Sequence, residues 1–354
     1  MGFADDDMSE KQPKRSTYLT RHAGARVCVV GIGKQGAKLA GALIEMGYAL
    51  VGVCDRDQRA LTKFQSCHPG VFTTREVADI AGVEPEAVVV ATLADHHLLV
   101  IRELEKTGIR RILCEKPVVG SLAEARELTE LVEKTPLSIN VFHTNLFSPD
   151  YAAFKEQLQS EQLGRLVSVS GHFKPNGFGN MGCHYLAMVL NILSTRISSV
   201  ESAFFSAKNP KQRAHGHEDR NGRATFLLEN GASLSLENLP TVPPRDWRVV
   251  FDFEHGRAEI LTKSTSYVIW DGRKATISET PFQLQGFGLK KAPETGYRIL
   301  DRAVCSLLDD EPNTSFSLGC QAVEAIIAAH HCFVRNERVV LPLAQGTECL
   351  FRFS

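Results

Sequence analysis

A glycine-spaced turn directly after a short apolar segment constrains this chain most. Residues 26–30 (Arg-Val-Cys-Val-Val) have the composition of a buried strand, and Gly31, Gly33 and Gly36 follow at once. An apolar-periodic helix is predicted from there to about residue 46. In such a unit the first glycine makes the tight turn, the second lets the backbone approach a pyrophosphate, and the third lets the helix pack on the strand. The pattern predicts a dinucleotide site.

An acidic residue at the expected distance supports this site. A second predicted strand, residues 49–54, ends in Asp55, nineteen residues after Gly36, where a carboxylate can accept hydrogen bonds from an adenosine ribose. Asp55 would repel a 2′-phosphate, so NAD is favoured over NADP. Arg56 and Lys34 leave NADP open, since either could pair with that phosphate.

Strands and helices alternate up to about residue 145. Further strands are predicted at 87–91, 111–114 and 137–142, and helices at 95–106 and 121–133. Short connections between alternating elements are typical of a doubly wound sheet, here of about six parallel strands. Residues 25–145 are therefore predicted to form a Rossmann domain. Residues 1–24 are polar and aperiodic, and a disordered tail is expected there.

The pattern changes after residue 145. Helices are predicted at about 148–160 and 181–193, with a strand at 166–173 before the second. Strands of alternating polarity follow at 197–206, 223–229, 232–238, 247–254, 257–262 and 266–270, with hairpin signals at residues 229–231 and 271–272, and helices at 294–309 and 317–335 close the chain. The expected fold class is α/β plus α+β. In it, residues 146–354 form a domain on a large, mainly antiparallel sheet that is open on one face.

A lysine stands at the end of one buried strand, in Cys114-Glu115-Lys116-Pro117. Parallel strands deliver their next residues to the carboxyl edge of the sheet, where ligands bind. Pro117 favours an extended conformation for Lys116, so this side chain is expected to enter the crevice. On position alone, a surface lysine in a strand-to-loop corner remains an alternative.

Composition excludes several function classes. A net charge of −1 and a pI near 6.9 do not favour nucleic acid as a partner. No apolar run approaches the roughly 20 residues of a membrane helix, and an unexported, cytoplasmic protein is expected. The nine cysteines contain no C-x-x-C pair, which indicates reduced thiols, and no histidine or cysteine cluster has the spacing of a metal site.

The order and spacing of these motifs resemble the Gfo/Idh/MocA oxidoreductases. The resemblance is carried by the segments at 31–36, 91–97, 114–117, 145–149 and 182–184, and extends over about residues 25–342. It implies a Rossmann domain plus a mixed-sheet domain whose open face supports homo-oligomers (dimer or tetramer), and a sugar- or cyclitol-like substrate. The cofactor-binding residues implied by position are Gly31, Ile32, Gly33, Lys34, Gln35, Gly36, Asp55, Arg56, Ala91, Thr92, His97, Glu115 and Lys116.

The same resemblance implies catalytic roles. Lys116 would donate or accept the proton at the reacting oxygen, and Glu115 would help hold the nicotinamide ribose. The family pattern D-x-G-x-H is Asn180-Met181-Gly182-Cys183-His184 here, so the histidine is present and the aspartate is replaced. Asn180 can bind a hydroxyl but cannot exchange a proton, so any relay runs through His184 and Lys116. For His184, a satisfied core histidine is the alternative.

Other departures fall on the substrate side. A second family acid is Ala187, and an arginine often found before Phe147 is Leu146. Substrate contacts are expected, more weakly, from His143, Asn145, Lys174 and Asn176. The predicted activity is NAD(P)-dependent hydride transfer to or from a secondary alcohol or ketone. Two alternatives stay open: redox-neutral use of a tightly bound cofactor in elimination or glycoside cleavage, and a non-catalytic NAD(P)-binding regulator.

Overall fold

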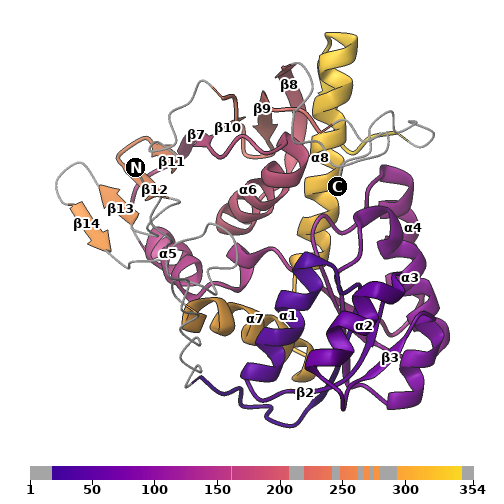
Figure 1. Cartoon of the computed structure of the whole chain (residues 1–354). Coiled ribbons are helices and arrows are strands. Elements are labelled where there is room, and N and C mark those ends of the chain that lie inside the picture. The colour runs from indigo at the N-terminus through magenta and orange to yellow at the C-terminus, as the bar shows by residue number, and fades with distance from the viewer. Residues whose placement is uncertain are drawn as a thin grey trace, which may run out of the picture.

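The structure, a computed structural model, describes residues 18–160, 162–206, 219–240, 248–261, 267–270, 275–278 and 293–344. Two β-sheets, each packed against helices, organise this part of the chain (Figure 1).

Six parallel strands form the first sheet, in the order β3-β2-β1-β4-β5-β6. The strands are β1 (Arg26–Val30), β2 (Ala49–Cys54), β3 (Phe72–Thr74), β4 (Ala87–Val90), β5 (Arg111–Cys114) and β6 (Ser138–Val141). Every residue of β4 is buried, which explains its continuous apolar sequence. The edge strand β3 is too short to show a periodicity, and no sequence pattern located it. The predicted doubly wound domain is confirmed.

Helices cover both faces of this sheet. They are α1 (Lys34–Glu45), α2 (Gln58–Cys67), α3 (Ala94–Lys106) and α4 (Leu122–Lys134), with short 3-10 turns η1 (Val77–Val83) and η2 (Thr144–Phe147). Alternate residues of β1 pack into two different hydrophobic clusters, one on each face of the sheet. Val29 packs in one cluster with Leu39 and Leu43 of α1, whereas Val30 packs in the other with Ile101 of α3.

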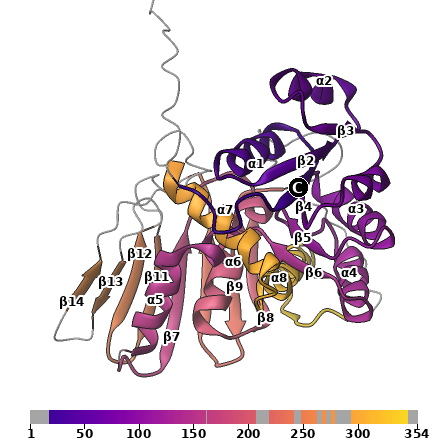
Figure 2. The ribbon, with the colours of Figure 1, turned by 90° about the horizontal axis from the view of Figure 1, so that it is seen from below.

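A helix from the second predicted domain completes the first one. α7 (Pro293–Leu308) contributes Leu300, Ala303 and Val304 to the apolar cluster that contains Val29 and Leu113 of the first sheet. Figure 2 shows α7 running between α1 and the helices of the second domain. A division at residue 145 remains a prediction, and the packing of α7 crosses it.

Part of the predicted disordered tail is packed against α7. The hydroxyls of Tyr18 and Tyr48 each donate a 2.7 Å hydrogen bond to the carboxylate of Asp301, and Thr20 is 5% exposed. The backbone N–H of Thr20 also donates to the carbonyl of Met46 at 2.9 Å. Local composition could not show these long-range partners, so the structure corrects the predicted end of the tail. Residues 1–17 lie outside the described part of the chain.

The second sheet has the order β14-β13-β12-β11-β7-β10-β9-β8-β15. Its strands are β7 (Leu166–His172), β8 (Ile197–Phe205), β9 (Gly222–Leu228), β10 (Ser233–Glu237), β11 (Arg248–Phe253), β12 (Arg257–Leu261), β13 (Tyr267–Trp270), β14 (Ala275–Ser278) and β15 (Val339–Val340). β7 and β10 pair in parallel and the other described pairings are antiparallel, as predicted. Gly231, at φ +83°, makes the expected hairpin between β9 and β10. The signal at residues 271–272 falls outside the described residues.

Three helices complete the second half: α5 (Pro149–Ser160), α6 (Phe178–Leu193) and α8 (Ser315–Arg335). α6 begins three residues before its predicted start because Gly177, at φ +86°, turns the chain directly into it. α5 and α6 lie along one face of the second sheet, in front of β7 and β9 in Figure 2.

α8 also corrects an expectation. By length and composition it could cross a membrane, although no such run was anticipated from the sequence. In the structure 67% of its apolar window is buried, and it packs against α6, β8 and β6. Of the cysteines, the eight in described residues are free, and Cys28, Cys54 and Cys114 are buried in strands as predicted.

Candidate active site

The glycine turn leaves the amino end of α1 open. A Cβ at Gly36 would lie 1.7 Å from the carbonyl oxygen of Gly31, and Gly31, at φ +87°, lies against the backbone of Ala91 and Thr92. A Cβ at Gly33 would meet nothing within 4 Å. Gly33 is also the N-cap of α1, with no side chain bonded to the free amides there. This end of α1 therefore suits an anionic group such as a pyrophosphate.

Asp55 lies beside this turn. Its Oδ2 accepts a 2.8 Å hydrogen bond from the amide of Ile32, and its Oδ1 accepts one of 2.9 Å from Asp57. Each carboxylate oxygen can accept a further hydrogen bond, so Asp55 can still receive ribose hydroxyls. Lys34 and Arg56 are exposed, and the Arg56 guanidinium lies 3.2 Å from Nε2 of His96. The residues that left NADP open are thus on the surface near Asp55.

Glu115 links the turn to the strand that carries the lysine. Its Oε1 accepts a 3.0 Å hydrogen bond from the Gln35 side chain, and its Oε2 accepts one of 3.2 Å from the amide of Lys116. Burial raises the pKa of Glu115. The structure therefore brings Gln35, Glu115 and Lys116 together at the carboxyl edge of the first sheet.

His97 is placed differently from its prediction. It is 1% exposed, its Nδ1 lies 3.1 Å from the carbonyl oxygens of Pro117 and Val118, and its Nε2 lies 3.2 Å from that of Thr92. Because both ring nitrogens face backbone carbonyls, the structure supports a structural role for His97, and a contact with the cofactor stays a prediction. The ring braces the segments that follow β4 and β5, a role that spacing along the chain could not distinguish from binding.

Lys116 points at the first turn of α6. Its Nζ donates a 2.7 Å hydrogen bond to Oδ1 of Asn180 and one of 3.2 Å to the backbone carbonyl of the same residue. The Lys116–Pro117 peptide bond is cis. Nδ2 of Asn180 donates to the carbonyl of Asn176 at 3.3 Å, which orients the amide with its oxygen toward the lysine. The structure thus adds a direct contact between Lys116 and Asn180, and the hydroxyl-binding role of Asn180 stays a prediction.

Two histidines lie next to this pair. The rings of His143 and His184 are edge to face, with centroids 5.3 Å apart. Neither nitrogen of His143 has a hydrogen-bond partner in the described residues, and neither does Nδ1 of His184. Burial and the nearby charge of Lys116 lower the pKa of His143 to about 3 and that of His184 well below its usual value. Both rings are therefore neutral and able to bind hydroxyl groups of a ligand.

The other predicted substrate residues are less direct. Asn145 is 6% exposed and its amide nitrogen donates to the thioether of Met188 at 3.6 Å. Lys174 and Asn176 take part through backbone carbonyls, which accept from Asn238 and Asn180. A role for these three residues toward substrate stays a prediction.

Sequence reasoning missed Asp219. This carboxylate is 8% exposed and accepts hydrogen bonds from the amides of Gly179 (2.7 Å) and Asn180 (2.8 Å). Burial raises its pKa to about 6, although these two bonds and Lys116 act in the opposite direction. Asp219 is separated from the first turn of α6 by about forty residues, so no local motif marked it. The only available signal was an acidic residue at the end of a polar loop.

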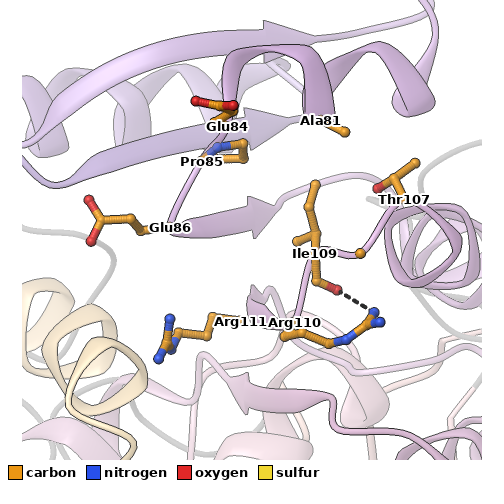
Figure 3. A pocket seen from close by; sticks show the side chains of 9 residues that line it. Ala81, Glu84, Pro85, Glu86, Thr107, Ile109, Arg110 and Arg111 are labelled. Carbon is orange, nitrogen blue, oxygen red and sulfur yellow. Dashed lines mark hydrogen bonds between the residues drawn. The ribbon is translucent and has the colours of Figure 1, made fainter.

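A separate pocket lies at the opposite edge of the first sheet (Figure 3). It is lined by residues 84–86, ahead of β4, and 107–111, ahead of β5. Arg111 is paired with Asp310 at 2.9 Å and Arg110 lies 3.6 Å from Glu105. These are the amino ends of parallel strands, whereas ligands bind at the carboxyl ends, so this pocket is not the active site.

Three buried histidines lead to a pH prediction. Burial lowers the pKa of His97, His143 and His184 from the ordinary 6.5, to about 3 for His143. Below pH 6.5 these histidines are protonated in the unfolded chain but not in the folded chain, so the folded state loses stability as pH falls. We expect His143 alone to cost about 2 kcal/mol of unfolding free energy between pH 7 and pH 5. Urea unfolding at pH 7, 6 and 5 measures this.

Asp219 acts in the opposite direction, and a variant separates the two effects. The pKa of Asp219 is about 6 in the folded chain and 3.8 in the unfolded chain, so at pH 5 the folded chain binds this proton more tightly. This offsets about 1 kcal/mol of the unfolding free energy that the histidines cost. His143→Gln removes one histidine and leaves Asp219 unchanged. Its stability should depend less on pH than that of the wild type. An unchanged slope would contradict a neutral, buried His143.

Comparison with known proteins agrees with this geometry. Residues 25–143 match a family described as an oxidoreductase family with an NAD-binding Rossmann fold, Gfo/Idh/MocA. An uncharacterized oxidoreductase of Schizosaccharomyces pombe is 27% identical over 113 residues, 32% of this chain and 30% of that protein. The scyllo-inositol 2-dehydrogenase (NAD(+)) of Bacillus subtilis is 24% identical over 182 residues, 48% of this chain and 52% of the enzyme. The chain thus spans about a third to a half of these curated relatives.

Solved structures extend the likeness to both domains. An oxidoreductase of Agrobacterium radiobacter, in complex with NAD+, L-tartaric acid and magnesium, has a TM-score of 0.74 at 18% identity, covering 90% of this chain and 98% of that one. The myo-inositol dehydrogenase of Lactobacillus casei, with NAD(H) and myo-inositol, has a TM-score of 0.72 at 17% identity, covering 92% and 98%. At these identities the likeness establishes the fold. Residues 25–143 are thus similar in sequence to the Gfo/Idh/MocA oxidoreductases, and the chain shares the fold of these two solved structures.

Proposed function

We propose that this protein is an NAD-dependent oxidoreductase that acts on a secondary alcohol or ketone of a sugar- or cyclitol-like substrate. The observation that carries the proposal is the Lys116 amine, held by Asn180 beside two neutral histidines, at the same sheet edge as the open glycine turn. The solved myo-inositol dehydrogenase has the same fold, and the scyllo-inositol 2-dehydrogenase of Bacillus subtilis is similar in sequence over about half its length.

In this proposal, different residues of the chain hold the cofactor and exchange the proton. Bound NAD would supply the hydride acceptor or donor. Gly31, Gly33 and the free amides of α1 would hold its phosphates, Asp55 its adenosine ribose, and Glu115 its nicotinamide ribose. Lys116 would take the hydroxyl proton in oxidation and return it in reduction, and a positioned acid or base of this kind contributes about 10²- to 10⁴-fold to rate.

The polar groups around Lys116 favour an uncharged, hydroxylated substrate. His143, His184 and Asn180 are neutral hydrogen-bonding groups, and the orphan nitrogens of His143 gain partners when hydroxyls bind. Ala187, where relatives often have an acid, is buried on α6. Because these three side chains carry no positive charge, they would pair poorly with a phosphate or carboxylate group of a substrate.

Assembly and location are part of the proposal. On the face of the second sheet away from α5 and α6, a row of small polar side chains crosses the central strands, with Ser170 paired to Ser235 and Ser235 to Thr225. We infer a homo-oligomer that packs through this face. The eight free cysteines among the described residues support a reducing, cytoplasmic location.

A substrate screen tests the activity. The full chain is mixed with NAD+ and a panel of sugars, cyclitols and their acids, and the reduced-nicotinamide absorbance band is followed. Turnover with a polyol supports the proposal. Product formation with no net absorbance change would show redox-neutral chemistry, and nucleotide binding without any turnover would show a regulator; either result overturns it.

Asp55 predicts the cofactor preference. The carboxylate would repel a 2′-phosphate, so NADH is expected to bind at least about tenfold more tightly than NADPH, roughly 1.4 kcal/mol. Fluorescence titration of both nucleotides measures the ratio. Asp55→Ala should narrow it, whereas Lys63→Ala, a change on the exposed face of α2, should not. Tighter binding of NADPH by the wild type would contradict the role given to Asp55.

A further inference from the structure

Asp219 is hydrogen-bonded to Asn180, the residue that accepts the hydrogen bonds of Lys116. The two oxygens that accept from Nζ of Lys116 both belong to Asn180, and the amide of Asn180 donates to Oδ2 of Asp219 at 2.8 Å. A continuous path therefore runs from the Asp219 carboxylate through Asn180 to the Lys116 ammonium. No other residue of α6 is bonded to both ends of this path in the described chain.

The carboxylate acts as a helix cap from a distant part of the chain. The N-cap residue of α6, Gly177, supplies no side-chain hydrogen bond, and Asp219 accepts from the amides of Gly179 and Asn180 instead. It thereby satisfies two of the amides that a helix leaves unpaired at its amino end. The first turn of α6, and with it the position of Asn180, depends on this side chain.

The surrounding backbone leaves Asp219 little freedom to move. A Cβ at Gly177 would lie 2.0 Å from Oδ2 of Asp219, so the chain passes directly against the carboxylate. The amide of Phe178 donates to the carbonyl of Arg220 at 2.8 Å, and that of Gly177 donates to Oδ1 of Asn221 at 3.0 Å. Residues 177–180 and 219–221 are thus joined by successive hydrogen bonds.

A charge at this position needs an explanation. An uncharged cap can serve a helix, as Ser121 does at α4, where its hydroxyl accepts from the amide of Glu124. Asp219 is buried and forms no ion pair within the described residues, so its desolvation is not offset by a directly bonded cation. The capping amides of Asn180 and Gly179 do most to lower the pKa of this carboxyl against the effect of burial, and the nearby charge of Lys116 acts in the same direction. Asp219 and Lys116 therefore lie close enough for their charges to interact across Asn180.

We propose that Asp219 is a positioning residue for Lys116, which fixes Asn180 against the ammonium and supplies the negative charge that an aspartate at position 180 would otherwise provide. The proposal rests on the proposed function of Lys116 as the acid and base. It also accounts for Asn180: with the charge one residue farther from the amine, the ammonium is held but is easier to deprotonate than in direct contact with a carboxylate.

The reactivity of the Lys116 amine tests this without any substrate. The full chain is treated with a trace of isotopically labelled acetic anhydride at pH 8, and acetylation of the peptide that contains Lys116 is measured by mass spectrometry. Asp219→Asn should raise the acetylation rate about threefold to tenfold, because the ammonium loses its charge partner and its fixed oxygens. Glu324→Gln, which alters a carboxylate bonded to the amide of Leu343, should leave the rate unchanged.

Two further variants keep the test decisive. Asn180→Ala leaves the bonds of Asp219 to the α6 backbone intact and should raise acetylation to a similar extent, even if Asp219→Asn folds poorly. The double variant Asn180→Asp with Asp219→Asn returns a carboxylate to the ammonium and should restore slow acetylation, which a variant with a misfolded site would not do. Unchanged acetylation in Asn180→Ala, or no restoration in the double variant, would overturn the proposal.

Kinetics separate this role from the proposed function. Once a substrate is known, Asp219→Asn should lower kcat about tenfold with KM within about twofold, since substrate-binding groups are unchanged. If acetylation responds as expected but the wild type turns over no substrate, the proposed function fails and the positioning role stands. If the wild type is active and neither kcat nor acetylation changes in Asp219→Asn, the positioning role fails alone.

Discussion

Replacing Lys116 with alanine is expected to abolish turnover while leaving the cofactor site intact. Among the described residues the amine is the one cation bonded within the site, and burial keeps the neighbouring rings of His143 and His184 neutral. If Lys116 is the acid and base, its loss leaves no other described cation in the site to exchange the proton, so kcat should fall by about 10²- to 10⁴-fold. NADH affinity should stay within about threefold, because the phosphates and the adenosine ribose are held elsewhere.

Two matched variants separate charge from proton transfer. Lys116→Arg keeps the cation and can still donate to Asn180, but a guanidinium does not release its proton, so it should be nearly as inactive as the alanine variant. Lys63→Ala removes an exposed lysine of α2 and should retain wild-type kcat. Near-normal kcat in either Lys116 variant would show that another group exchanges the proton.

Most of the first domain could be predicted from local sequence patterns. The glycine spacing, the acid after the second strand and the alternation of apolar segments each depend on neighbours within about thirty residues, and they predicted a doubly wound parallel sheet, although not the edge strand β3. The same local reasoning could not place α7, whose apolar face packs on the first sheet although it begins about 150 residues after that sheet ends. A helical pattern shows that a face is apolar, but it does not show which sheet will cover it.

The residues of the candidate site likewise include some that local sequence could predict and others that it could not. Lys116, His184 and Asn180 could be predicted because each stands at a fixed place in a strand end or helix turn. His97 was assigned to the cofactor because it begins a helix at the right edge, yet its ring turns inward to three backbone carbonyls. Asp219 was missed because its partners, Gly179 and Asn180, are about forty residues away. Side-chain direction and long-range hydrogen bonds are set by tertiary packing.

Three glycines of α1 and its turn, Gly33, Gly36 and Gly41, give the second large expected effect, because each tests a different claim. Gly36→Ala places a Cβ 1.7 Å from the Gly31 carbonyl, so helix and strand must separate, and about 3 kcal/mol or more of unfolding free energy should be lost. Gly33→Ala meets no atom within 4 Å, so the fold should be unaffected, but its methyl group would occupy the approach of the pyrophosphate.

Comparing urea unfolding with NADH titration separates these claims. Gly33→Ala should retain wild-type stability and bind NADH at least about tenfold more weakly, a loss near 1.4 kcal/mol. Gly41→Ala, in the same helix and with no atom within 4 Å of its Cβ, should bind NADH normally and gain up to about 1 kcal/mol of stability, because alanine favours a helix over glycine. Unchanged NADH affinity in Gly33→Ala would mean that the open amino end of α1 does not hold the phosphates. The nucleotide site would then have to be sought away from the feature that most constrains this fold.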